Sequence, residues 1–488
     1  MTNYVHDIKK VYYTSNVYQN NQTLNSVDLN FVPYESNRMN YAFDNCQNLK
    51  SVSNINKNIT HLYKTFNNCT NLVNPPVIPN GVTNMHSTFY QCISIINAPS
   101  IPNSVVDMQS TFYNCTNLIN APVIPNSITA MYFTFYNCTN LINAPVIPNS
   151  ITTIYSAFNN CTNLVNVPDI PNSVTNMYSA FSYCSNLVNA PAIPNSVTNM
   201  YSTFRSCTNL VNAPDMSNAT SVINMSGTFN QCSNLINAPV IPNSVTNMAS
   251  TFEECNHIVN APAIPNSVIN MKSTFEGCHN LVNAPDMSNA TNVTDMTSTF
   301  EECISLINAP IIPNSVTTMT YTFAWCSNLI NMPFISNSVT NMQGAFFDCI
   351  RLANVTNIPS SVINMSGTFW SCSKLTGNIY IYSNQIINAS ECFDDTSLTK
   401  NVYIPFTYIN GEHTATYNSF IAAGYDTLGT NCGVYLMEIP DEHVIDNTEY
   451  IATFNGMNTT TQIANEAYLT KYIGSKNVVD VPIGLEQG

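Results

Sequence analysis

The sequence predicts a repeat solenoid of the α/β type, a rod of about fifteen coils with short parallel strands, capped at both ends. Two observations predict this fold class. Cysteine recurs every 23 residues from Cys46 to Cys207 and continues, with two steps of 25 residues, to Cys372. Each of these fifteen cysteines has Phe three residues before it and Leu or Ile three residues after it. A period of this length means that each unit is one coil whose apolar side chains stack on those of its neighbours.

The elements within a coil follow from the unit M-x3-F-x2-C-x2-[LI]-x-N-A-P-x-I-P-N-S-V-x2, as at residues 108–129. Of the 27 prolines, 22 fall at two positions of the unit, such as Pro99 and Pro102. Because proline cannot donate a backbone hydrogen bond, we expect the parallel strand to be only a few residues long, roughly Leu-x-Asn-Ala. We expect a short helical turn over M-x3-F-x2-C.

The composition agrees with a folded chain that has a polar, weakly charged surface. Of 488 residues, 44% are hydrophobic and 8% are charged, and 28 acidic against 13 basic residues give a net charge of −15. This balance argues against nucleic acid as a partner, because affinity for phosphates comes largely from clustered cations. No run of 18 apolar residues occurs, and the first ten residues lack the apolar stretch of a signal peptide. We therefore expect neither membrane insertion nor export by that route.

The repeat resembles a known family. C-x2-L, a bend with proline, Val and then a returning Phe-x-x-Cys resemble the leucine-rich repeat of BspA-like bacterial surface proteins, over residues 39–375. Asn-Met-Ser-Gly-Thr-Phe at residues 224–229 and 364–369 is similar to the related repeat of mycoplasma-type surface proteins. The resemblance implies a leucine-rich repeat rod that presents an extended surface for binding.

The ends of the chain depart from the unit. We interpret residues 1–38 as an N-terminal cap or attachment segment and residues 376–436 as degenerate repeats and a C-terminal cap, since solenoids need atypical end units. Residues 401–436 resemble segments that follow such repeats in bacteriophage structural proteins. Residues 437–488 are expected to form a small module or an assembly contact.

The cysteines are expected to be buried, reduced and inert. C-x2-C is absent, and the total of 17 is odd, which does not fit a simple zinc or disulfide framework. Residues stacked one coil apart have parallel Cβ vectors, which disfavours bridging. Cysteine also behaves as a small hydrophobic residue when buried.

A second column consists of thirteen asparagines two residues after the repeat Leu or Ile, from Asn74 to Asn354. Their stacked amides would form either a hydrogen-bonded ladder along the rod or a polar face for a ligand. We favour the ladder, because identical residues serve stacking better than recognition.

Tyrosines mark the candidate binding surface. They fall one residue after the Met position and one residue after the Phe, four residues apart, so that on a helical turn they would share a face. The first set comprises Tyr132, Tyr155, Tyr178 and Tyr201, and the second Tyr90, Tyr113 and Tyr136. Together they predict an aromatic stripe along one edge of the rod, which is either a plain surface coat or a contact site.

Carboxylates replace the tyrosines further along the same column. Glu253, Glu276 and Glu301 follow the Phe, with Glu254 and Glu302 beside them. Such residues are usually solvated, and no Asp/Asn/Gly loop of a Ca²⁺ site accompanies them. We therefore predict no metal and no cofactor.

No motif for catalysis is present. The seven histidines occupy different repeat positions, and H-E-x-x-H, G-x-S-x-G, the P-loop and G-x-G-x-x-G are all absent. No base stands at a fixed spacing from the cysteines to activate a thiol. We therefore expect a protein that is not an enzyme.

The prediction for function is a non-enzymatic virion surface or structural protein, such as a phage tail-fibre, baseplate or capsid-decoration component assembled in the host cytoplasm. Its expected partners are a host-surface glycan or protein, or neighbouring virion proteins. One alternative is a BspA-like adhesin on a microbial cell surface, and another is an intracellular interaction scaffold. The repeat itself does not decide among them, because fold does not fix function.

Overall fold

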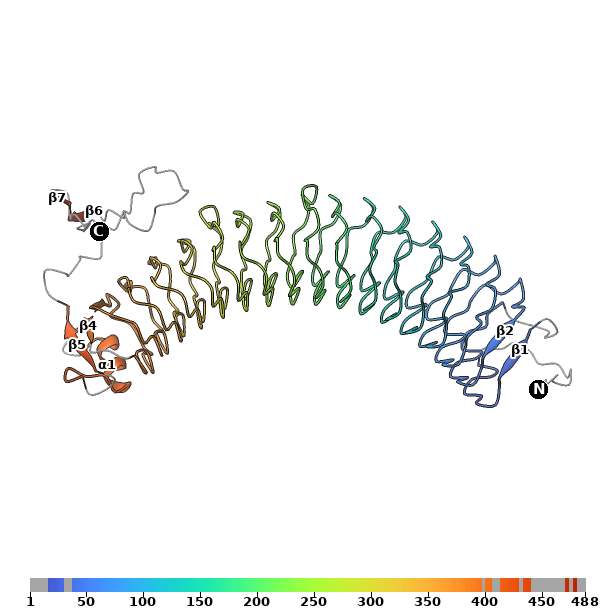
Figure 1. Ribbon diagram of the computed structural model, residues 1–488, viewed down its shortest axis with the longest axis horizontal. Helices are drawn as coiled ribbons and strands as arrows, with labels where there is room; N and C mark the ends of the chain where they lie inside the picture. Colours follow the sequence, from blue (N-terminus) through green and yellow to red (C-terminus); the bar gives the residue numbers. More distant parts are fainter. Residues whose placement is uncertain are drawn as a thin grey trace. The chain divides into compact units, whose positions relative to one another are not determined.

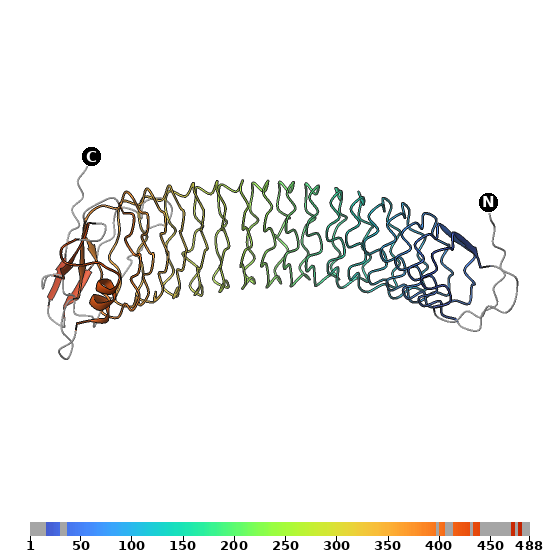
Figure 2. The same cartoon turned by 90° about the horizontal axis from the view of Figure 1, so that it is seen from below.

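The computed structural model describes residues 16–29, 37–396, 400–405, 413–429, 433–439, 470–473 and 477–480. The chain divides into two compact units, Met1–Met437 and Glu438–Gly488. Through the first unit the coils lie side by side in sequence order (Figures 1 and 2). Among the described residues, no helix has the length and apolarity needed to cross a membrane.

Regular strands and the helix occur near the ends of the chain. They are β1 (Ser26–Asp28), β2 (Ser51–Ser53), β3 (Ile379–Tyr380), β4 (Lys400–Ile404), α1 (Ala415–Ala422), β5 (Val434–Glu438), β6 (Thr470–Ile473) and β7 (Asn477–Asp480). β1 pairs with β2 and β3 pairs with β4 in parallel, and the second sheet has the order β3-β4-β5. In the second unit, β6 and β7 form an antiparallel pair.

Between these ends, parallel pairing is reduced to isolated bridges in two columns. One column passes through the Asn of Asn-Ala-Pro, as in Asn97 to Asn120, and the other through the residue before Met, as in Asn84 to Asp107. The strand predicted over Leu-x-Asn-Ala is therefore shorter than expected. The proline two residues after twelve of the thirteen Asn has no N–H for the ladder. The second column was not predicted.

The segment from Met to Cys is a series of tandem turns, so the prediction of a helical turn is wrong. In the unit from Met85 to Cys92, Thr88 N donates to Met85 O at 3.0 Å and Cys92 N donates to Phe89 O at 3.1 Å. The third residue of each turn has a positive φ, 53° at Ser87 and 59° at Gln91, which makes both turns type II. A left-handed residue every fourth position prevents an α-helix.

The turn segment also carries much of the hydrogen bonding between coils. Met85 N donates to Asp107 O and Phe89 N to Thr111 O, both at 2.9 Å and both in the next coil. This pattern recurs along the solenoid. Equivalent residues of successive coils are thereby held in line.

The core contains a continuous stack of phenylalanine rings. From Phe43 to Phe393, consecutive ring centroids are 5.4–5.8 Å apart and their planes differ by 2–12°. Tyr18 extends the stack before the first cysteine, 5.3 Å from Phe43. At the other end, Phe420 of α1 and Tyr425 lie 6.3 and 6.0 Å from Phe393.

The cysteines form a second buried column, as expected. All sixteen described cysteines are buried and free. Each thiol with a described bond donates to a carbonyl of the preceding coil, as Cys92 Sγ does to Phe66 O at 3.0 Å. Burial raises the pKa of fifteen of these thiols, for example to about 12 at Cys161.

The predicted stacking of the asparagine amides is confirmed at four pairs. Each Nδ2 donates to the Oδ1 of the preceding coil at 2.6–2.7 Å. The pairs are Asn120 with Asn97, Asn166 with Asn143, Asn283 with Asn260, and Asn354 with Asn331. This column therefore serves as a ladder along part of its length.

Candidate binding surface

The turn segment places its outward side chains in columns, and six of the seven tyrosines form two stacked groups of three. Tyr113 lies 4.5 Å from Tyr90 and 4.6 Å from Tyr136 between ring centroids, with the planes within 6°. Tyr178 lies 4.4 Å from Tyr155 and 4.6 Å from Tyr201, with the planes within 14°. Tyr132 is tilted by 49° against Tyr155, at 6.0 Å.

Phe133 joins the two groups, and sequence reasoning missed it. Its ring lies 6.0 Å from Tyr136 of the same coil and 5.3 Å from Tyr155 of the next, at 60° and 67°. The backbone of Phe133 has a φ of 51°, at the left-handed turn position. Phe133 and the seven tyrosines form one continuous aromatic surface, which we call the aromatic stripe.

The stacked rings present mainly their edges and hydroxyl groups. Parallel stacking covers both faces of Tyr113 and Tyr178, and all members of the stripe except Tyr132 are half-buried. Burial, and then the neighbouring phenols, raise the pKa of Tyr113 to about 12. The same causes raise the pKa of Tyr178. The hydroxyls of Tyr113 and Tyr178 therefore stay protonated over the physiological range, and the stripe presents a row of hydrogen-bond donors and acceptors.

A second aromatic cluster lies in later coils. Phe347 lies 4.9 Å from Trp325 and 4.6 Å from Trp370, and Trp370 Nε1 donates to Asp395 at 3.0 Å. Tyr321 lies over Gly344 of the next coil, where any Cβ would meet the ring. Their positions in the unit, one or two residues after Phe or two after Met, were the signal that could have identified them from the sequence.

The glutamates that lie in the sequence between the aromatic stripe and this second cluster repel one another. Burial is the main cause that raises the pKa of Glu276, and the charges of Glu301 and Glu253 raise it further. Burial and then Glu302 raise the pKa of Glu301. In the described residues, no group of three or more His, Cys, Asp and Glu side chains could hold a metal ion.

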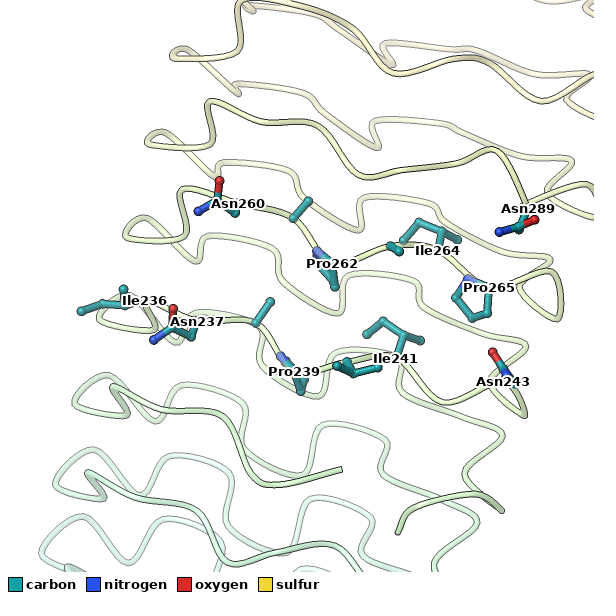
Figure 3. A pocket seen from close by; sticks show the side chains of 14 residues that line it. Ile236, Asn237, Pro239, Ile241, Asn243, Asn260, Pro262, Ile264, Pro265 and Asn289 are labelled. Atoms are coloured by element: carbon teal, nitrogen blue, oxygen red, sulfur yellow. The ribbon is translucent and has the colours of Figure 1, made fainter. Parts of the chain in front are cut away.

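A surface hollow of about 470 Å³ is lined by two adjacent coils and by Asn289 of the next one. Prolines and isoleucines line its middle, with asparagines at both ends (Figure 3). Pro239 and Ile241 come from one coil, and Pro262 and Ile264 from the next. No charged side chain or histidine lines it, so it offers apolar and amide contacts without an acid or base.

Comparison with known proteins agrees with the repeat. A family model described as the BspA type leucine rich repeat region matches residues 36–164, 130–259, 201–320 and 296–420. No curated protein sequence matches the chain.

Several solved structures resemble it. A leucine-rich repeat protein from Bacteroides ovatus is 20% identical, with 80% of this chain and 87% of that chain covered and a TM-score of 0.48. A leucine rich cell surface protein from Faecalibacterium prausnitzii is 20% identical, with 73% and 87% covered and a TM-score of 0.40. A leucine rich repeat protein of T. pallidum is 25% identical, with 34% and 78% covered and a TM-score of 0.30.

Proposed function

Because this chain belongs to the BspA-type leucine-rich repeat family, we propose that it is a non-enzymatic binding protein whose aromatic stripe contacts a glycan or a protein on a cell surface. The observation that carries the proposal is the row of stacked tyrosines, Tyr90 to Tyr136 and Tyr155 to Tyr201, joined through Phe133. Rigid amphipathic rings supply contact area at low entropic cost and are enriched at interfaces.

The net charge of the chain limits the class of ligand that it can bind. With a net charge of −15, the protein approaches anionic surfaces weakly. The exposed edges of the stripe offer neutral hydroxyls in a line, which suits an extended neutral ligand with polar groups along its length. A neutral glycan or an uncharged protein surface fits this description.

The chemistry of the side chains supports a role without catalysis. A nucleophilic cysteine needs its thiolate, and burial raises the pKa of the cysteines of this column. Cys232, for example, has a pKa of about 12, so its thiol stays protonated at neutral pH. The hollow near Pro239 holds no acid or base either.

Binding is tested with the triple variant Tyr155→Ser, Tyr178→Ser, Tyr201→Ser against a chip of immobilised neutral oligosaccharides and against whole cells. We expect binding to fall at least about tenfold, because the loss of central aromatic anchors typically costs more than 1 kcal/mol each. Tyr380→Ser is the control, since Tyr380 stacks on Tyr403 near the C-terminal end, outside the stripe. Unchanged binding by a folded triple variant would refute the role of the stripe.

We propose that the protein is part of a virus particle, and the alternative is that it is an adhesin on a microbial cell surface. Free thiols are typical of proteins that fold in a reducing cytoplasm, which supports the virion proposal. The family match supports the cell-surface alternative, since the repeat resembles that of BspA-like surface proteins. Gradient sedimentation of a lysed culture distinguishes them. Stoichiometric banding with particles supports a virion component, and recovery with cell envelopes supports the adhesin.

A further inference from the structure

An exposed aliphatic row runs along the solenoid on the segment after each cysteine. The residue four places after the cysteine is Val or Ile in twelve successive units, from Val73 to Ile330. Ten of these side chains are 37–48% exposed. They are Val73, Ile96, Ile119, Ile142, Val165, Val188, Ile236, Val259, Val282 and Ile307. A contiguous apolar surface of this extent marks an interaction site on a protein in water.

A column of amides follows the aliphatic row by one residue, and a second precedes it by two residues, interrupted by Ser94, His257 and Ser305. The first is the ladder that contains Asn97 and Asn120. In the second, Asn140 donates to Asn117 at 3.2 Å and Asn163 donates to Asn140 at 3.3 Å. Within a ladder each amide uses one N–H and one lone pair, so a second N–H and a second lone pair remain for a partner.

The segment that carries the row has no Lys, Arg, Asp or Glu of its own, and the nearest carboxylate that the structure records there is that of Glu302, 3.6 Å from His279. In the twelve units from Cys69 to Cys326, none of the five residues after the cysteine is Lys, Arg, Asp or Glu. The chain as a whole has 28 acidic residues and a net charge of −15. Two copies can therefore meet here without placing carboxylates against carboxylates, which would cost free energy.

The repeat favours a partner with the same spacing. Each coil contributes one aliphatic side chain, and the coils are held in line by backbone bridges such as Asn97 to Asn120 and Asn120 to Asn143. A second copy has the same spacing between coils, so the two rows match coil for coil where they meet. A partner with another spacing matches at only a few coils.

We propose that the aliphatic row and its two amide columns form a self-complementary interface with a second copy of this chain. Such an isologous contact closes after two chains. Over ten coils, the three columns supply about 30 residues from each copy, which reaches the size of a stable protein interface. The tyrosines of the aromatic stripe lie at other positions of the unit, so the proposed dimer leaves them to the ligand.

The test is the mass of the purified full chain by analytical ultracentrifugation over a range of concentrations. The double variant Ile119→Lys, Ile142→Lys places two cations in the row. The control, Val123→Lys with Val146→Lys, makes the same change in the same two coils at side chains that are 85% and 76% exposed but lie outside the row. Circular dichroism reports whether each variant is folded, and Ile119→Ser with Ile142→Ser replaces the lysine variant if that one does not fold.

We expect the wild type and the control to sediment at twice the chain mass of 53.9 kDa. We expect the row variants to be monomers, with a dimer Kd raised at least about tenfold. A monomeric wild type, or row variants that dimerise like the wild type, would overturn the proposal. The tyrosine triple variant should remain a dimer, so failure of the proposed ligand binding and failure of this dimer are distinguishable.

Discussion

The rings of Phe133 and of Tyr155 in the next coil meet in a T-shaped contact, with centroids 5.3 Å apart and planes at 67°. This contact joins the two stacked tyrosine groups into one surface, because Phe133 also reaches Tyr136. We expect Phe133→Ser to weaken ligand binding although no hydroxyl is lost, since an aromatic pair contributes about 0.5–1.5 kcal/mol. Binding to the oligosaccharide chip measures it, with Phe133→Tyr as the conservative control. Equal affinity for the Ser variant and the wild type would mean that the two groups act separately.

The free energy of unfolding of this protein should fall steeply as the pH rises in the alkaline range. Burial raises the pKa of fifteen thiols above their ordinary value of 9.0, so a folded thiol keeps its proton where an unfolded one loses it. The stability is therefore fully present below about pH 9 and lost as the pH rises towards the folded values. Each thiol that ionises only in the unfolded state lowers the free energy of unfolding by about 1.4 kcal/mol per pH unit.

The measurement is the urea midpoint at a series of pH values from 7 to 10, in the presence of a reductant. Cys161→Ala removes one such thiol. The dependence of the free energy of unfolding on pH should then be weaker by the contribution of one proton, about 1.4 kcal/mol per pH unit. A midpoint that stays constant up to pH 10 would contradict this account.

Gly344→Ala should be much more destabilising than Gly367→Ala. Both glycines have a positive φ, 59° and 60°, so the backbone cost of a Cβ is the same. At Gly344 the new Cβ would meet the ring of Tyr321, whereas at Gly367 the nearest atom is 4.0 Å away. We expect an extra loss of about 1–3 kcal/mol at Gly344, measured by thermal unfolding. Tyr321→Ala should rescue Gly344→Ala, and the absence of rescue would rule out this clash as the cause.

Phe204→Ala should weaken the solenoid locally. The ring of Phe204 is fully buried and lies 5.7 Å from Phe181 and 5.8 Å from Phe229. Loss of a buried Phe costs about 3–5 kcal/mol, and in a repeat protein the loss falls on the contacts with the two adjacent coils. We expect the single unfolding transition to split in two, as followed by circular dichroism in urea. Val240→Ala, at a side chain that is 82% exposed, should leave the transition unchanged.

The stacking of the fold could be predicted from the sequence, but the backbone path could not. A strict 23-residue period requires that Phe stacks on Phe and Cys on Cys, and both columns are present. The same period fits a helical turn and tandem type II turns equally well. The signal that separates them is local, since Gly227, Gly344 and Gly367 stand at the left-handed position two residues after Met, where other units have mostly Ser. Glycine, which has no Cβ, adopts a positive φ without steric cost.

For the candidate site, the tyrosines repeat and so were found from the sequence, whereas Phe133 does not repeat and was missed. Its role depends on which side chains of two adjacent coils approach each other, and a turn and a helix give different answers. The aliphatic row was missed for another reason. From the sequence, a Val or Ile next to the repeat Leu would be predicted to belong to the core. Only the exposed fractions show that these side chains face water.

The direction of the hydrogen bonds between coils determines how this protein should respond to force. Bonds such as that from Met85 N to Asp107 O link one coil to the next, so tension between the two ends pulls on one coil's bonds at a time rather than on all of them together. Each coil that detaches releases 23 residues, which extend to at most ~80 Å. Under tension, such a protein unfolds one coil at a time and lengthens in small steps, which dissipates the applied energy.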